Sequence, residues 1–150
     1  MQTGKVDPSA TDPDGKSMLN LAIGSAKVDT DPRTMQNIAD IVDTLCAAGA
    51  KFNAIDSSKL GPIHHCVRTM NIKAAKCLLD RGADIDLLDQ GKHTALDYMA
   101  LDRYPDVELT RMLVKKHAKL GSVELSRLKK VANQKQGSVR MLLKGVKKSY

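Results

Sequence analysis

The sequence predicts an all-α protein, a solenoid of stacked helix-turn-helix repeats that ends in a degenerate helical cap. A pattern that opens at Asp56 opens again at Asp89, 33 residues later, and a period of this length is typical of repeat proteins. Within each period, apolar residues recur at helical spacing. Aromatic residues make up only 3% of the chain and Trp is absent, so small aliphatic side chains, which suit closely stacked helices, must form the core.

The central period, residues 56–88, predicts two short helices. Pro62 fits the first turn of a helix, where its missing N–H removes only an unpaired donor, and apolar residues follow on one face as far as Thr69. A second apolar stripe, over residues 72–81, stops at Gly82, which is the residue expected just past a helix end. Two short helices cannot bury their apolar faces alone, so this unit needs neighbours stacked on both sides.

Two motifs in this period resemble the ankyrin repeat. Pro-Ile-His at residues 62–64 resembles the Thr-Pro-Leu-His of that family, and residues 78–84, Leu-Leu-Asp-Arg-Gly-Ala-Asp, resemble its Leu-Leu-x-x-Gly-Ala-Asp. The resemblance implies an ankyrin solenoid with finger loops between its helix pairs, and a non-catalytic role as an adaptor that binds other proteins. At His64 it implies a structural strut between neighbouring repeats.

A first repeat is expected over residues 12–55, where Ser17 stands at the position of the helix-capping Thr. Ser17 precedes Gly61 by 44 residues, so this repeat holds 11 residues more than the period of 33. The insertion is placed at residues 26–34. It is either family variation or a partner contact.

The second helix of this first repeat is expected to be long. Asp31 is the predicted cap and Pro32 the predicted first residue, and apolar residues share one face from Met35 to Cys46.

A third repeat is expected over residues 89–120. Thr94 can cap its first helix, Asp97 replaces the usual His, and its second helix follows Asp106. His117 occupies the position of the Gly that ends the helix pair, so it must adopt a positive φ or reshape the turn.

The two ends of the chain differ from the repeats. Residues 1–11 predict a flexible leader, in which residues 4–7 resemble the end of an ankyrin repeat, so the chain could also be a regulatory segment of a larger enzyme. Residues 121–150 predict a degenerate basic cap of two amphipathic helices. From residue 111 onward, 12 Lys and Arg against one Glu give +11, which leaves −4 for the first 110 residues of a chain whose net charge is +7.

The sequence offers little for catalysis, so we expect no enzyme and no cofactor. Adjacent helical residues point about 100° apart, so His64, His65 and Cys66 cannot converge on one metal or substrate atom. The three cysteines lack the spacing of a zinc site or a disulfide framework and are taken as reduced core residues. Reduced cysteines, together with the absence of an apolar run of about 20 residues, predict an intracellular protein, cytoplasmic or nuclear.

The finger loops and the first helix of each repeat are the predicted partner-binding surface, because ankyrin arrays use these parts. Leu60 and Leu101 are expected to be exposed apolar side chains, extended by Ile55 and Leu88. The alternative is that the finger loops fold back and bury them. The complete predicted set is Lys16, Ile55, Ser57, Ser58, Leu60, Arg68, Leu88, Gln90, His93, Leu101 and Asp102.

The basic end supports a second hypothesis about the partner. A charge of +11 over 40 residues attracts anions, so the chain could instead be an adaptor for nucleic acid or another anion. No aromatic residue precedes Tyr150 in this stretch, so base stacking is not available, and a solvated cap facing an acidic protein neighbour explains the lysines as well. The residues of this alternative anion site are Arg127, Lys129, Lys130, Arg140 and Lys144.

Overall fold

The structure is a computed structural model that describes residues 7–26, 31–101 and 106–121, and of residues 100 and 101 only the backbone. Within these ranges the chain is helical and contains no strand, so the all-α prediction is confirmed there. The helices are α1 (Met18–Gly24), α2 (Pro32–Ala47), α3 (Pro62–Arg68), α4 (Ile72–Asp80), α5 (Ala95–Leu101) and α6 (Val107–Lys115).

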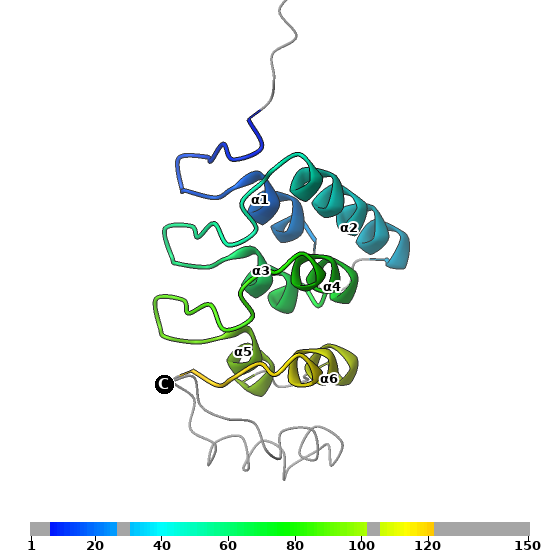
Figure 1. Cartoon of the computed structure of the whole chain (residues 1–150), viewed down its shortest axis with the longest axis vertical. Coiled ribbons are helices and arrows are strands. Elements are labelled where there is room, and N and C mark those ends of the chain that lie inside the picture. Colours follow the sequence, from blue (N-terminus) through cyan, green and yellow to red (C-terminus); the bar gives the residue numbers. More distant parts are fainter. Residues whose placement is uncertain (1–6, 27–30, 102–105, 122–150) are drawn as a thin grey trace, which may run out of the picture.

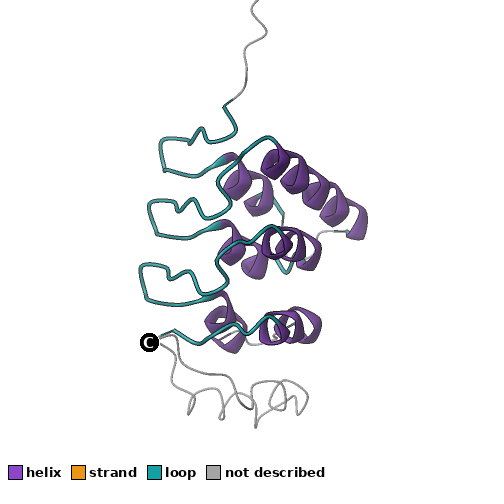
Figure 2. Cartoon of the chain, viewed as in Figure 1, coloured by secondary structure: helices purple, strands orange, loops and turns teal. Residues whose placement is uncertain are grey.

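The helices form three antiparallel pairs that stack in chain order (Figure 1). In one layer α1 packs against α3 and α3 against α5, and in the other α2 packs against α4 and α4 against α6. Long loops project to one side of the stack, one before each of α1, α3 and α5 (Figure 2). We refer to residues 12–55, 56–88 and 89–120 as units 1, 2 and 3, and to the loops at residues 12–16, 56–60 and 89–93 as fingers 1, 2 and 3.

The helix ends agree with the local sequence signals. The helices predicted over residues 62–69 and 72–81 are observed as α3 and α4, each ending one residue earlier. Asp31 caps α2, whose first residue is Pro32, as expected. Side-chain oxygens also cap α1 and α6, where Ser17 accepts a hydrogen bond from the Asn20 N–H and Asp106 accepts one from the Leu109 N–H.

Each pair ends in a turn with a residue in the left-handed conformation. The φ angle is 95° at Gly49, 92° at Gly82 and 63° at His117. The prediction that His117 would need a positive φ is therefore confirmed. A side chain in this conformation costs roughly 1–2 kcal/mol, so unit 3 closes with a strained turn where the other two units use Gly.

The core runs through all three units along the interface between the two layers. Its fully buried side chains include Leu19, Ile63, Leu78, Leu96 and Leu113, which come from five different helices. Neighbouring pairs therefore bury each other's apolar faces, as short helices require.

Several predictions fall on residues outside the described ranges. These are most of the leader at residues 1–6, the centre of the insertion at residues 27–30, Asp102, and the basic cap from residue 122 onward with its five predicted anion-binding residues. Among the described residues no helix is long and apolar enough to cross a membrane.

Candidate partner-binding surface

The three fingers share one backbone geometry. Each begins with an aspartate whose N–H donates to the carbonyl four residues later and whose Oδ1 accepts from the N–H of that same residue. The N–H···O=C distances are 3.0 Å for Asp12 and Lys16, 3.0 Å for Asp56 and Leu60, and 3.1 Å for Asp89 and His93. These bonds fix the shape of each finger from within, because the carboxylate satisfies donors that a free loop would leave to water.

A residue in the left-handed conformation occupies the fourth position of each finger. It is Gly15 in finger 1, with φ 74°, but Lys59 and Lys92 in the other two, with φ 58° and 59°. Gly is the residue suited to this φ, so the two lysines make the conformation of fingers 2 and 3 strained. The finger geometry nevertheless persists, since the aspartate bonds hold the loop against the strain.

The fingers also pair edge to edge. The Ser57 N–H donates to Asp14 O at 3.2 Å and the Gln90 N–H donates to Ser58 O at 3.3 Å. Pro13 occupies the same position in finger 1 and has no N–H to donate. The three loops therefore form one continuous surface rather than independent projections.

We refer to α1, α3 and α5, each of which follows a finger, as the inner helices. At equivalent positions of α1 and α3, a polar side chain bonds to the next unit. Asn20 Nδ2 donates to Leu60 O at 3.4 Å, and His64 Nε2 lies 3.2 Å from His93 O. His64 Nδ1 also accepts from the Gly61 N–H at 3.1 Å. The expectation that His64 is a structural strut is confirmed. Its burial lowers the pKa of the imidazole, so the ring is held neutral.

Asp97 occupies this position in unit 3. Its Oδ2 accepts from the N–H groups of Thr94 and Gly121, at 2.9 and 2.8 Å, and so joins α5 to the segment that follows α6. Burial raises the pKa of this carboxyl, and its Oδ1 is buried without a partner among the described residues.

A second set of polar contacts connects α3 and α5 to the finger of the same unit. In unit 2 His65 Nε2 lies 3.2 Å from Asp56 Oδ2, and in unit 3 the Tyr98 hydroxyl donates to Asp89 Oδ2 at 2.5 Å. Burial lowers the pKa of His65 despite the opposing effect of Asp56, and burial together with Asp89 raises the pKa of Tyr98 to about 12. In unit 1 the same position holds Leu21, which is 44% exposed, so that unit lacks the contact.

The side chains of the run His64-His65-Cys66 do not converge on one point. The two imidazoles bond to different fingers, as described above, and Cys66 is fully buried, which raises the pKa of its thiol. Cys46 and Cys77 are half-buried rather than buried as predicted, and all three thiols are free. No group of three or more His, Cys, Asp or Glu side chains that could hold a metal ion occurs among the described residues.

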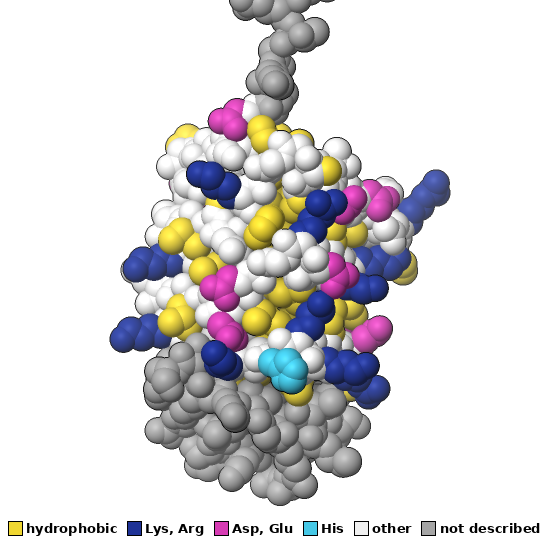
Figure 3. Space-filling model, viewed as in Figure 1, with side chains coloured by type: hydrophobic (Ala, Val, Ile, Leu, Met, Phe, Trp, Pro, Cys, Tyr) yellow, Lys and Arg dark blue, Asp and Glu magenta, His cyan; other side chains and the backbone are white. Residues whose placement is uncertain are grey.

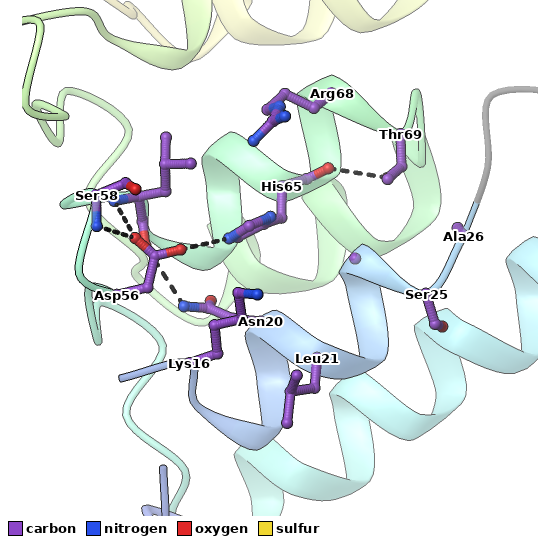
Figure 4. Close-up of a pocket in the computed structure, with 12 residues that line it drawn as sticks. Lys16, Asn20, Leu21, Ser25, Ala26, Asp56, Ser58, His65, Arg68 and Thr69 are labelled. Carbon is purple, nitrogen blue, oxygen red and sulfur yellow. Dashed lines mark hydrogen bonds and ion pairs between the residues drawn. The ribbon is translucent and has the colours of Figure 1, made fainter. Parts of the chain in front are cut away.

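An open groove of about 800 Å³ lies between units 1 and 2 (Figure 4). One wall comes from the end of finger 1 and from α1, and the other from finger 2 and α3. Its lining residues are Lys16, Asn20, Leu21, Gly24, Ser25, Ala26, Asp56, Ser58, Leu60, His65, Arg68 and Thr69. Because both units contribute to it, the groove depends on their stacking.

Of the predicted partner-binding residues, Lys16, Ser58, Leu60 and Arg68 line this groove. Sequence reasoning missed Leu21 and His65 as lining residues. A comparison of equivalent positions could have found them, because Leu21 lies 44 residues before His65, the same offset as between Ser17 and Gly61.

The prediction that Leu60 is exposed is wrong, since only 8% of it is accessible. The finger folds back onto α1, where Leu60 O accepts from Asn20 Nδ2 and the Leu60 N–H donates to Asp56. The leucine therefore lines the groove as a buried side chain. Nothing is described of the side chain of Leu101.

Other predicted residues lie outside the groove but at the surface. Ile55 and Leu88 are 46% and 41% exposed, in agreement with the prediction, and they occupy equivalent positions before fingers 2 and 3. Ser57 and Gln90 are exposed and His93 is half-buried. Figure 3 shows hydrophobic side chains at the surface close to basic and acidic ones, with no large area of a single kind.

The comparison with known protein families agrees with these features. Residues 60–90, which hold the end of finger 2, α3, α4 and the start of finger 3, match the family model of the ankyrin repeat. None of the curated proteins matches the chain. The motifs at residues 62–64 and 78–84 lie inside the matched segment, so residues 60–90 form an ankyrin repeat.

Proposed function

We propose that the three units are successive repeats of an ankyrin solenoid, and that the chain is a non-catalytic adaptor that recognises another protein. Ankyrin repeats generally mediate protein–protein interaction. The observation that carries the proposal for this chain is the groove between units 1 and 2, whose walls come from two fingers and two inner helices. A partner seated there contacts a surface that only the stacked array provides.

The polar groups of this surface favour binding over catalysis. The buried carboxylates and imidazoles around the groove are bonded to the backbone or to each other, as in the pair of Asp56 and His65. A general base or nucleophile has to reach a substrate atom, whereas these side chains hold the fingers in place. We therefore propose that the chain is not an enzyme.

The alternative anion-binding role of the basic cap remains a prediction, because its residues lie outside the described ranges. The two hypotheses differ in their response to salt. Binding through Arg127, Lys129, Lys130, Arg140 and Lys144 should weaken steeply as salt rises, whereas binding through the groove and fingers should change much less.

Site-specific photo-crosslinking in nuclease-treated cell extract tests the proposal. The crosslinking amino acid p-benzoylphenylalanine replaces Leu21 in one bait and Ile41 in a control bait. Both positions are exposed apolar residues, at 44% and 49%, but Ile41 lies in α2 and does not line the groove. We expect one protein to be crosslinked from Leu21 and not from Ile41.

Two results would contradict the proposal. One is a crosslinked protein from Ile41 with none from Leu21, which places recognition on the opposite layer. The other is that Leu21 gives a crosslink in a parallel untreated extract but none in the nuclease-treated extract, which favours the basic cap and a nucleic acid as the bridge.

A further inference from the structure

Two basic side chains of the groove are available to an anion. Arg68, at the end of α3, is exposed, and its guanidinium makes no hydrogen bond or ion pair within the described residues. Lys16 Nζ lies 3.7 Å from Asp14 Oδ2, with the two side chains 40% and 71% exposed. An exposed pair at this distance contributes little to stability, so Lys16 can exchange Asp14 for another carboxylate at low cost.

The acidic side chain among the lining residues does not compete for these cations. Both oxygens of Asp56 are already occupied, Oδ1 by the N–H groups of Ser58 and Leu60 at 2.9 Å and Oδ2 by His65 at 3.2 Å. Only 4% of its side chain is accessible. An anion that enters from solvent therefore meets Arg68 and Lys16 first.

The two cations face the same part of the groove. Figure 4 shows His65 between Arg68 and Lys16. After burial and the opposing influence of Asp56, the charges of both residues lower the pKa of His65, so both cations are near enough to influence this ring. A single carboxylate near His65 can therefore interact with both.

The groove also offers an apolar contact beside this charge. Leu21 is 44% exposed on the α1 wall, and Gly24, one turn later, has no side chain to cover it. Exposed leucine next to two accessible cations favours a ligand that carries both an acid and an aliphatic group.

We propose that the groove between units 1 and 2 binds an acidic segment of the partner protein, with a carboxylate between Lys16 and Arg68 and an aliphatic side chain on Leu21. This inference rests on the proposed function and names the chemistry of the partner. A nucleic acid fits less well, because the described lining residues include no Phe, Tyr or Trp for base stacking and only two cations for phosphates.

Selection from a random twelve-residue peptide library, displayed on phage and panned on the purified full chain, tests the inference. Enriched peptides are then synthesised, and their affinities are measured by calorimetry for the native chain, Arg68→Glu and Lys73→Glu. Lys73 is an exposed residue of α4 that does not line the groove, so its reversal gives the same change in net charge.

We expect the enriched peptides to combine Asp or Glu with Leu, Ile or Val. Arg68→Glu should weaken their binding about tenfold while Lys73→Glu changes it little. Replacing the peptide's acidic residue with Lys should restore binding to Arg68→Glu, because the charge pair is then re-formed with opposite signs.

Other outcomes separate this inference from the proposed function. If Leu21 crosslinks a partner but the enriched peptides are neutral or basic, the array recognises proteins and the inference about acidic segments is wrong. The inference also fails if acidic peptides bind Arg68→Glu as tightly as the native chain, or if a (dT)12 oligonucleotide displaces them. If no peptide is enriched and Leu21 yields no crosslink, both proposals fail.

Discussion

Replacement of His64 with Ala tests the strut that joins units 2 and 3. The imidazole is fully buried, accepts the Gly61 N–H at 3.1 Å, bonds to His93 O at 3.2 Å and packs edge-on against Tyr98 at 5.9 Å between ring centroids. Removing the ring leaves a cavity that costs about 2–3 kcal/mol, at or below the low end for large-to-small changes. It also leaves the Gly61 N–H unpaired, for about 1–2 kcal/mol more.

The expected loss in the free energy of unfolding is therefore about 3–5 kcal/mol. His93 O adds little to this, because it still accepts the Asp89 N–H at 3.1 Å. The loss is a large part of the total stability of a small domain, about 5–15 kcal/mol. Urea unfolding followed by circular dichroism at the helical minimum measures it in a chain without Trp.

The control for this experiment is Ser57→Ala, which removes an exposed hydroxyl and leaves the backbone bond of Ser57 to Asp14 in place. This variant should stay within about 0.5 kcal/mol of the native chain. A loss below about 1 kcal/mol in His64→Ala, with an unchanged dependence on urea, would refute the reasoning, because the ring would then contribute no more than an ordinary surface residue.

Three further predictions follow from the same contacts. Burial lowers the pKa of His64 and His65 in the folded state, so the unfolded chain binds protons more readily below its own pKa of about 6.5. The stability that the two neutral imidazoles contribute should therefore be fully present above about pH 6.5 and fall as the pH drops below it. Urea midpoints that stay constant from pH 7 to pH 5 would contradict this. His117→Gly removes a side chain from a residue at φ 63° and should raise the free energy of unfolding by about 1 kcal/mol, seen as a higher Tm; a lower Tm would show that the turn is not strained. Leu60→Asp should unfold unit 2 because it buries a charge, whereas Ile55→Asp should fold normally, since Leu60 is 8% and Ile55 46% exposed; equal circular dichroism spectra and melting curves for the two would contradict the burial of Leu60.

Local sequence signals predicted the helices well. Pro62 marked the start of α3, Asp31 with Pro32 marked the start of α2, and Gly82 marked the turn after α4. Each of these residues acts through its own backbone angles or through donors within the next turn, so its effect is readable from neighbours in the chain.

The candidate site was only partly predictable, because it depends on contacts between residues that are far apart in the chain. Leu60 was expected at the surface, yet its exposure depends on how finger 2 folds against Asn20 of α1, 40 residues earlier in the chain. The role of Leu21 as a groove residue likewise depends on the position of α3 in the next unit. A repeat pattern indicates which positions are equivalent, but not how much of each side chain the neighbouring unit covers.

Gly61 is a further residue whose surroundings could not be predicted from the sequence. Ser17 and Thr94 occupy the equivalent position in the other two units, where a side chain can cap the helix, whereas unit 2 has Gly. In the structure a Cβ atom on Gly61 would lie 2.3 Å from Leu87 Cδ2. A side chain at Gly61 would therefore require Leu87, in the segment before finger 3, to shift, and no pattern near Gly61 reveals this contact.

By itself, therefore, the sequence determined the helix pairs, their caps and turns, the period of 33 and the resemblance to ankyrin repeats. These features depend on backbone geometry and on hydrogen bonds within a few residues. Tertiary structure alone decided which apolar residues are exposed, which carboxylates are already bonded, and that Arg68 and Lys16 line the same groove. Those properties depend on contacts between units, because packing one helix pair on the next buries some side chains and leaves others exposed to water.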